Sequence, residues 1–240
     1  QDLTIVSVTM LDPTKGAVKI DGTNVVFTPA KDYNFLVGGL AEFEYTVKDN
    51  GTTNGKSDPL TATAKVSVTI SEVNDNPVAG PNSSMTAEEN AVSITVTELL
   101  SNDGPGGASD EANQVLSVVS AKLADSSASA GEVTLANGQL TFTPAKDFNT
   151  YLTTPVVVHY TVQDNGTTNG SLDPASSIGQ WLITVTEVND APEIKDDGKT
   201  SDSDPNPALP DVFVKNYSTI IKVSSIVGND IVGPANEIPQ

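Results

Sequence analysis

Oxygen-bearing side chains gather in a short motif that occurs twice, as EVNDNP at 72–77 and as EVNDAP at 187–192. In the first motif, Glu72, Asn74 and Asp75 are alternating or adjacent oxygen donors. The proline that follows them, Pro77, stops a strand or helix from continuing. Calcium binds about six to eight oxygens from carboxylates, Asn side chains and backbone carbonyls, so this mixture suits it better than a transition metal. Carboxylates held close together repel one another and need a neutralising cation. The motifs therefore predict bound Ca2+.

The two motifs belong to a duplication. FTPAKDYN at 27–34 returns as FTPAKDFN at 142–149, and YTVKDNGTTNGKSDP at 45–59 returns as YTVQDNGTTNGSLDP at 160–174. Each pair is separated by 115 residues, as are the two acidic motifs. Three motifs at one spacing indicate a repeated structural unit, which determines how the whole chain is divided. One complete repeat is predicted at 77–191.

The segments on either side of this repeat are incomplete in opposite ways. Residues 192–240 begin a further copy, because VSSIVGND at 223–230 parallels VTELLSND at 96–103, but they lack the second half. Residues 1–76 lack the first half, because they open with QDLTIVSV, which parallels QVLSVVSA at 114–121. Either the chain is a window on a longer array, or the end of one molecule completes the beginning of another.

Period-2 alternation of apolar and polar residues predicts antiparallel strands that position these motifs. Val66, Val68 and Ile70 alternate with polar residues, and the 115-residue shift carries them to Trp181, Ile183 and Val185. Further strands are predicted at 3–10, 17–20, 24–28, 41–48, 92–97, 115–123, 132–135, 139–143, 155–163 and 217–224. The Asn-Gly pairs at 50–51, 137–138 and 165–166 are expected to supply hairpin turns with positive φ. About seven short strands per repeat, with no convincing amphipathic helix, predict an all-β fold of immunoglobulin-like Greek-key β-sandwiches.

The composition excludes several classes of protein. Twelve basic and 31 acidic residues give a net charge of −19, and such a surface repels phosphate backbones and anionic lipids. The absence of cysteine excludes disulfides and thiolate metal sites. No apolar run approaches the roughly 18 residues of a spanning helix, and no charged-then-apolar leader precedes Gln1. We expect a soluble chain with an export signal outside this sequence, no nucleic-acid partner and no membrane insertion.

The segment from Val47 to Pro77, VKDNGTTNGKSDPLTATAKVSVTISEVNDNP, resembles the final strands of a cadherin-type repeat, and residues 160–192 match it equally. Both contain an aspartate-glycine turn, a proline, a long alternating strand and the acidic linker. The FTPAKDYN and FTPAKDFN segments and LLSND at 99–103 are more similar to the cadherin-like tandem repeats of giant bacterial surface adhesins, often with RTX-type secretion. The resemblance covers nearly the whole chain. It implies tandem immunoglobulin- or cadherin-like Greek-key β-sandwiches in an elongated array.

The resemblance also implies which residues bind calcium at the junctions between neighbouring domains. At the first junction the implied ligands are Asp32, Glu72, Asn74, Asp75, the Asn76 backbone, Asn102, Asp103 and Asp164. At the second junction they are Glu89, Asp147, Glu187, Asn189, Asp190, Asn229 and Asp230. Two positions depart from the family pattern: Ala191 replaces the second linker Asn, and Asn149 stands where cadherins place a second acid. One ion per junction is therefore expected rather than three.

Other features have competing interpretations. An isolated Asp in a loop ordinarily just keeps a surface solvated. The segment EIKDDGKTSDSDPNP at 193–207 is equally consistent with a disordered or ornamental loop and with an additional calcium loop. Trp181 could be a stacking platform for a sugar, but its equivalent Val66 follows the inward alternation, which favours the core.

Signals for catalysis are weak. His159 is the only histidine, and its equivalent in the first copy is Glu44, so it is expected to point outward from a strand. Paired carboxylates could suggest a glycosidase, but their repetition at domain joints favours a structural role. We expect no enzymatic activity.

The sequence thus predicts calcium-stiffened extender repeats of an extracellular, cell-surface bacterial adhesin or fibre. The expected partners are neighbouring repeats or copies of the chain joined head to tail, with host or biofilm surface ligands as further candidates. Two alternatives stay open: a glycan- or protein-binding module of an adhesin, and an accessory domain of a secreted polysaccharide-degrading enzyme.

Overall fold

The structure is a computed structural model that describes residues 1–107, 109–151, 153–192, 194, 227, 228 and 230. It contains two compact units. One unit comprises Gln1–Asn82, Thr95–Ala121 and His159–Gln180, and the other comprises Ser83–Ile94, Lys122–Val158 and the chain from Trp181 onward. The predicted strand at 217–224 and most of the acidic segment at 193–207 lie outside the described residues.

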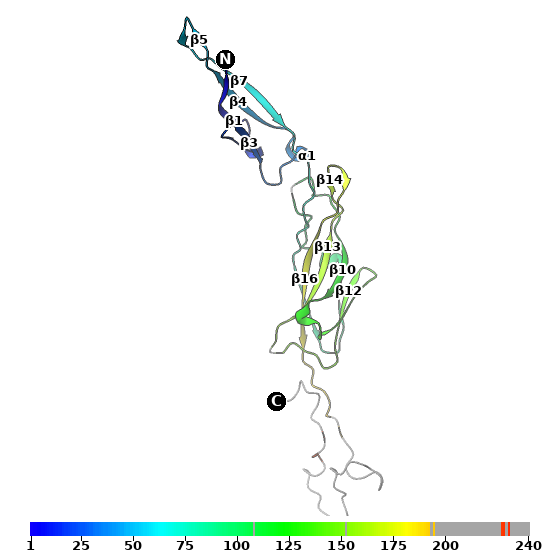
Figure 1. The fold of residues 1–240 in the computed structure, drawn as a ribbon. Helices are drawn as coiled ribbons and strands as arrows, with labels where there is room; N and C mark the ends of the chain where they lie inside the picture. Colours follow the sequence, from blue (N-terminus) through cyan, green and yellow to red (C-terminus); the bar gives the residue numbers. More distant parts are fainter. Residues whose placement is uncertain (108, 152, 193, 195–226, 229, 231–240) are drawn as a thin grey trace, which may run out of the picture. The chain divides into compact units, whose positions relative to one another are not determined.

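The first copy, residues 1–76, forms a three-stranded sheet and two hairpins (Figure 1). The sheet has the order β1-β4-β7, with β1 at Leu3–Met10, β4 at Ala41–Asp49 and β7 at Thr61–Val68. The hairpins pair β2 (Gly16–Asp21) with β3 (Asn24–Pro29) and β5 (Thr52–Thr53) with β6 (Lys56–Ser57). A 3-10 turn (Pro13–Lys15) and the one-turn helix α1 (Phe35–Gly38) complete this copy.

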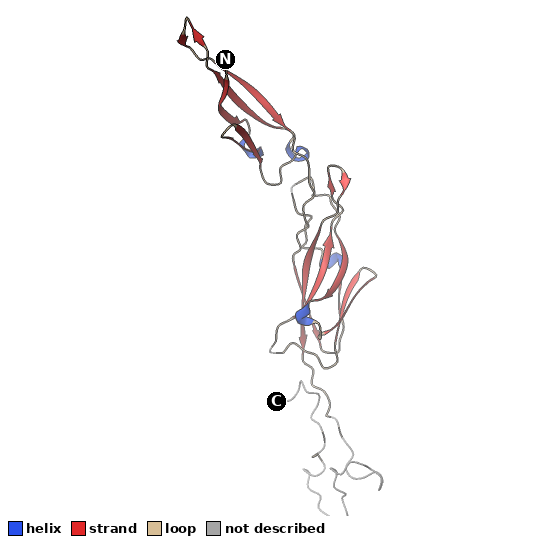
Figure 2. Cartoon of the chain, in the orientation of Figure 1, coloured by secondary structure: helices blue, strands red, loops and turns tan. Residues whose placement is uncertain are grey.

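The second copy, residues 77–191, has a four-stranded sheet, a three-stranded sheet and one hairpin (Figure 2). The four-stranded sheet has the order β10-β13-β16-β8, with β10 at Ser117–Leu123, β13 at Val156–Gln163, β16 at Ser176–Thr186 and β8 at Pro81–Ala87. The other sheet has the order β11-β12-β9, at Gly131–Ala136, Gln139–Pro144 and Val92–Thr95. The hairpin joins β14 (Thr167–Thr168) to β15 (Ser171–Leu172), and the helical turns are α2 (Val96–Leu99) and Asp125–Ser127. The predicted all-β sandwich fold is confirmed.

The core of the second copy follows the alternation of its central strands. β13 buries every second residue from Val156 to Val162, and β16 does so up to Val185. Trp181 is fully buried, and its indole N–H donates to Ser84 Oγ at 2.8 Å. This places Trp181 in the core, as predicted, rather than on a sugar-binding surface. His159 is half-buried and occupies the alternate face of β13, in agreement with its predicted orientation.

The prediction that Asn-Gly pairs supply hairpin turns with positive φ is wrong for two of the three pairs. Asn137–Gly138 has positive φ at both residues, but Asn50–Gly51 and Asn165–Gly166 do not. Those pairs follow an aspartate whose carboxylate accepts the glycine N–H at 3.0 Å, and this side-chain turn requires no left-handed residue. The tight hairpin turns lie four residues further on, at Asn54–Gly55 and Asn169–Gly170, where both residues do have positive φ.

Candidate functional site

The linker that follows the first copy is bound by two loops of the second copy. Both loops lie at the same end of the four-stranded sheet, because the start of β10 neighbours the end of β13: the Val115 N–H donates to Asn165 Oδ1 at 2.7 Å. One loop carries residues 109–114 and the other carries residues 164–169. The acidic linker at 72–77 therefore meets acidic residues from two separate parts of the sequence.

Asn74 is the central residue of the linker. Its amide donates to Asp164 Oδ1 and to the Asp173 carbonyl, both at 2.9 Å, and its backbone N–H donates to Thr168 Oγ1 at 3.0 Å. Its own amide oxygen accepts from Gln114 Nε2 at 2.8 Å. Asn74 thus ties the linker to both loops without any ion.

The other linker residues make similar contacts. The Asn169 N–H donates to Glu72 Oε2 at 2.7 Å, and the Asp75 N–H donates to Glu111 Oε1 at 2.8 Å. Glycines allow this close approach: a Cβ on Gly166 would collide with the Asn74 side chain, and a Cβ on Gly107 would contact both Glu111 Oε2 and Asp75 Oδ2. Two carboxylates therefore converge on one glycine.

Three carboxylates at this joint share one feature. Each has one oxygen held by hydrogen bonds, whereas the other oxygen is buried with no hydrogen-bond partner. Asp164 Oδ1 accepts from Gly166 N–H, Ala175 N–H and Asn74, while Oδ2 is unpartnered. Asp110 Oδ2 accepts from Asn34 Nδ2 at 2.8 Å and Glu111 Oε1 accepts from Asp75, whereas Asp110 Oδ1 and Glu111 Oε2 are unpartnered. The Gln114 Oε1 atom is likewise buried and has no hydrogen-bond partner. We call Asp110, Glu111, Gln114 and Asp164 together the junction cluster.

The electrostatics of the junction cluster are unfavourable as they stand. Burial raises the pKa of Glu111, and the neighbouring carboxylates Asp75, Asp110 and Asp164 raise it further, although the hydrogen bond from Asp75 N–H opposes the shift. Glu111 is 2% exposed and Asp164 is 4% exposed. Buried polar atoms ordinarily have partners, and a positively charged group beside these oxygens would relieve the repulsion among the carboxylates.

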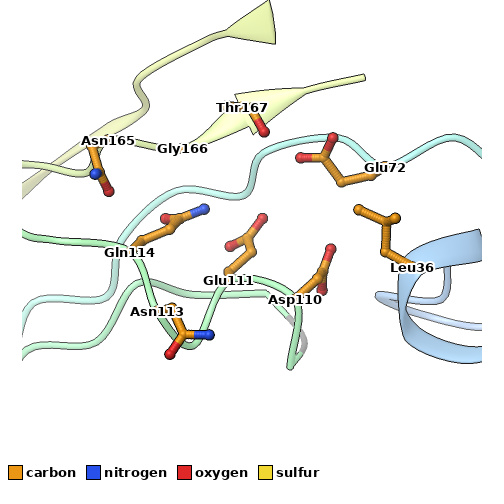
Figure 3. Close-up of a pocket in the computed structure, with 9 residues that line it drawn as sticks. All are labelled: Leu36, Glu72, Asp110, Glu111, Asn113, Gln114, Asn165, Gly166 and Thr167. Carbon is orange, nitrogen blue, oxygen red and sulfur yellow. The ribbon is translucent and has the colours of Figure 1, made fainter. Parts of the chain in front are cut away.

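A cleft of about 250 Å³ opens beside these residues (Figure 3). It is lined by Leu36, Glu72, Asp110, Glu111, Asn113, Gln114, Asn165, Gly166 and Thr167. The carboxylates of Glu72, Asp110 and Glu111 are gathered in this view, with Leu36 of α1 beside them. The wall of the cleft is therefore formed mainly by oxygen-bearing side chains.

The remaining residues implied as ligands at the first junction make other contacts. Asn102 Nδ2 donates to the Pro81 carbonyl and Asp103 Oδ1 accepts from Gly80 N–H, both at 2.7 Å, so they fasten the segment after the linker. Burial raises the pKa of Asp103, and burial together with Asp103 raises that of Tyr160 to about 12. Asp32 forms an ion pair with Lys31 at 2.9 Å, and the Asn76 carbonyl lies against Gly106.

The second set of implied ligands is only partly described. Asn229 lies outside the described residues, and Asp230 is half-buried. Asp147 forms an ion pair with Lys146 at 3.6 Å, Glu89 has positive φ, and Asn189 donates to the Asp190 carbonyl at 3.3 Å. Glu187 is half-buried in the strand-to-linker segment.

Several residues at both linkers lie outside the motifs that predicted the ligands. Glu88, next to the implied Glu89, is the buried acid: it accepts from Val188 N–H at 2.6 Å and from Asn149 Nδ2 at 3.1 Å. At the first linker, Asp110, Glu111, Gln114 and Asn34 were not identified. The two adjacent acids shortly before the predicted strand at 115–123 were the only available signal in the sequence, and it did not show which turn they would face.

The oxygen donors are of the chemical type that binds a hard cation, but they are not arranged as a complete coordination shell. Among the described residues, no three His, Cys, Asp or Glu side chains form a group that could hold a metal ion. The junction cluster and the linker combine carboxylate, amide and carbonyl oxygens with no nitrogen or sulfur ligand, which is the donor set that calcium prefers.

Two family models match the chain. Residues 73–175 match the cadherin-like domain, and residues 1–70 match the bacterial Ig domain. Domains of these two types are typical of extracellular, adhesion-type repeats and are ordinarily structural modules. In the part of the chain that the structure describes, no helix has the length and apolar character needed to span a membrane. No curated protein gives a significant match.

Similar solved structures are cadherins. A structure of protocadherin gammaB7 EC3-6 has a TM-score of 0.34 at 14% identity, covering 80% of this chain and 44% of that one. Human protocadherin-24 EC1-2 gives 0.38 at 16% identity, covering 78% and 82%, and human mucin-like protocadherin EC1-2 gives 0.32 at 16% identity, covering 78% and 84%. The chain thus spans less than half of the gammaB7 structure.

Proposed function

We propose that the chain is a calcium-stiffened structural segment of an extracellular bacterial adhesin or surface fibre. In this role the sandwiches are spacers, and neighbouring repeats or copies of the chain are the partners. The proposed role is mechanical and requires no catalysis. The proposal rests on one observation above all: at the first linker, three carboxylates each leave one buried oxygen without a hydrogen-bond partner.

The residues that would hold the ion are those with available oxygens. Asp110, Glu111, Asp164 and Gln114 contribute the unpartnered atoms, and Glu72 and Asp75 lie on the linker beside them. Calcium would neutralise charges that otherwise repel one another at the joint. Because these residues come from the linker and from two loops of the second copy, one ion would link segments that are distant in sequence.

Each proposed ligand is also held in place by the fold. Asp164 is fixed by two backbone N–H groups and Asn74, and Asp110 is fixed by Asn34. The Asn34 amide orientation is itself determined, because its oxygen accepts from Leu36 N–H and Val37 N–H and its NH2 must therefore face Asp110. Asn34 is accordingly a positioning residue and not a ligand through its side-chain oxygen.

The test compares two equivalent aspartates. Asp164 and Asp49 are 115 residues apart and make the same turn, since Asp49 Oδ1 accepts from Gly51 N–H and Leu60 N–H. Only Asp164 contacts the linker. Calcium at about 100 times its dissociation constant should stabilise the wild-type chain by about 2.7 kcal/mol, or roughly 10 °C for a repeat of this size.

Thermal unfolding with calcium and with chelator would measure this effect. Asp164→Asn should lose most of the calcium stabilisation, whereas Asp49→Asn should retain it. Because Asn can keep the oxygen that accepts the turn N–H groups, both variants should remain folded in chelator, so the comparison is of the shift that calcium adds to each. The proposal fails if calcium does not change the unfolding of the wild-type chain, or if both variants respond equally.

A further inference from the structure

The first copy holds one ammonium group by three contacts. Lys15 Nζ donates to the Gly38 carbonyl at 2.8 Å and to the Leu40 carbonyl at 2.9 Å. It also lies 5.8 Å from the centre of the Tyr33 ring. Two charge-assisted hydrogen bonds and a cation–π contact thus bind this group. The equivalent residue 115 positions later is Ala130, so the second copy has no side chain that makes these contacts.

The backbone at this position makes matching hydrogen bonds in the two copies. The Lys15 carbonyl accepts from Ala30 N–H at 3.1 Å, and the Ala130 carbonyl accepts from Ala145 N–H at 2.8 Å. The N–H groups of Lys15 and Ala130 each donate to the carbonyl three residues earlier, at 3.2 and 3.0 Å. The Ala130 side chain therefore starts from the same place in its copy as the Lys15 side chain does in the first.

A cavity of about 210 Å³ lies beside Ala130 in the second copy, and all of its lining residues belong to one compact unit. Four of the lining residues are Ala130, Phe148, Thr153 and Pro155. Their equivalents in the first copy are Lys15, Tyr33, Gly38 and Leu40. The cavity is therefore bounded by the counterparts of the lysine and of all three residues that its ammonium contacts. We call it the Ala130 pocket.

The lining of the Ala130 pocket suits an alkyl chain that ends in a cation. Ala130 and Val156 are each 2% exposed and provide apolar wall, and the Phe148 ring provides a π face. Ser127 Oγ accepts one backbone N–H at 3.0 Å and keeps a second lone pair. No lining residue is basic. Pockets for drug-sized ligands measure roughly 300–1,000 Å³, so this smaller pocket fits only a short ligand group.

The charges around the Ala130 pocket also favour a cation. Asn149, which lines the pocket, donates to Glu88 Oε2 at 3.1 Å, so a carboxylate lies directly behind the wall. The chain as a whole has a net charge of −19, which raises the local concentration of cationic ligands at its surface. An anionic ligand would be repelled by both.

We propose that the Ala130 pocket binds the ammonium end of a primary alkylamine, whose chain takes the place that the Lys15 side chain has in the first copy. The ammonium group would donate to the Thr153 and Pro155 carbonyls and lie over the Phe148 ring. The pocket uses no residue of the junction cluster, so the inference does not depend on calcium. The amine is either a small free amine or a lysine side chain of another protein, because both present the same group.

The experiment titrates the full chain, in chelator, with n-butylammonium, which reproduces the lysine side chain. Amide NMR should show saturable shifts at Ala130, Phe148 and Thr154. The uncharged analogue 1-butanol should bind about tenfold more weakly or worse, because it forms no charge-assisted hydrogen bonds. Nα-acetyl-lysine methylamide distinguishes the two sources: tighter binding than n-butylammonium identifies a protein lysine as the ligand, and weaker binding identifies a free amine.

Four variants test the location. Ala130→Lys should fill the pocket and abolish binding, and Ala130→Met should do the same without adding a charge. Ala136→Lys is the matched control, because it adds the same charge at an exposed position of β11 and should bind like the wild type. Lys15→Ala should open an equivalent pocket in the first copy and add a second site, with shifts at Tyr33. The near-ultraviolet signal of Trp181 would show that the second copy stays folded in each variant.

Several results would overturn the inference. The first is a wild-type chain that does not bind n-butylammonium, or that binds 1-butanol equally well. The second is binding that survives in both Ala130→Lys and Ala130→Met. The third is a set of shifts confined to the junction cluster, because the amine would then only be neutralising those carboxylates.

Discussion

The substitution Glu111→Gln should change the stability of the chain in opposite directions with and without calcium. Gln can keep the oxygen that accepts from Asp75 N–H, and it replaces the buried, unpartnered Oε2 with an NH2 group among carboxylates. Both Glu111 Oε2 and Asp75 Oδ2 lie against Gly107, so their separation is about 5 Å or less, and two charges at that distance repel by roughly 3 kcal/mol at an effective dielectric of 20. After screening by salt, we expect Glu111→Gln to stabilise the chelated chain by about 1–3 kcal/mol.

The pH dependence follows from the raised pKa of Glu111. The folded state binds this proton more tightly than the unfolded state, so in chelator the ionised Glu111 destabilises the fold at neutral pH. That penalty disappears as pH falls through the folded pKa toward the ordinary value of 4.5. The advantage of Glu111→Gln over the wild type should therefore be largest above the raised pKa of Glu111 and should vanish in acid.

Urea unfolding in chelator and in calcium, at several pH values, would measure both effects. With calcium the order should reverse, because the wild type keeps a carboxylate ligand and the variant does not. The matched control is Glu132→Gln on β11, an exposed acid whose substitution should be neutral in both conditions. A variant that is less stable than the wild type in chelator, or equally stabilised by calcium, would refute the reasoning.

Two further predictions concern pairs of equivalent residues. Trp181→Ala should cost about 3–5 kcal/mol in urea unfolding because it empties a closed core, whereas Val66→Ala at the half-buried equivalent position should cost about 1 kcal/mol or less; equal costs would contradict the difference in burial. Gly166→Ala should destabilise the chain by about 1–3 kcal/mol, since its Cβ would collide with the Asn74 side chain. Gly51→Ala meets the end of the flexible Gln1 side chain at 2.6 Å and the Asp49 carboxylate at 3.2 Å, so it should cost less; equal losses in thermal unfolding would contradict this.

The strands could be predicted from the sequence because their signal is local. β1, β2, β3, β4, β11, β12 and β13 begin and end within about two residues of the predicted ranges. The strand predicted at 92–97 begins as predicted but ends two residues early, at Thr95, because Thr95 and Glu98 form a capping box and start α2. β8 was missed because its polar sequence, PNSSMTA, has no alternation of large apolar residues.

The site was harder to predict because it depends on tertiary contacts. Linker residues such as Asn74 were identified from their motif, but Asp110 and Glu111 are recognisable only once β10 is placed beside β13. The equivalence of Asn34 and Asn149 was visible in the sequence, but its consequence was not. Both amides donate to an acid from a distant segment, Asp110 or Glu88, and only tertiary packing determines that contact.

The two oxygens of each junction carboxylate have different roles, and this difference has a thermodynamic consequence. One oxygen of Asp164, Glu111 and Asp110 is fixed by hydrogen bonds that do not involve an ion, so these side chains are ordered before a cation binds. Binding then requires little further loss of side-chain entropy, which ordinarily amounts to about 0.5–1.5 kcal/mol for each immobilised side chain. The hydrogen bonds that position the acids also bring their second oxygens together. In chelator the chain should therefore stay folded while these carboxylates repel one another at the first linker. A joint built in this way should respond to calcium mainly through the relief of that repulsion, and not through the folding of either copy.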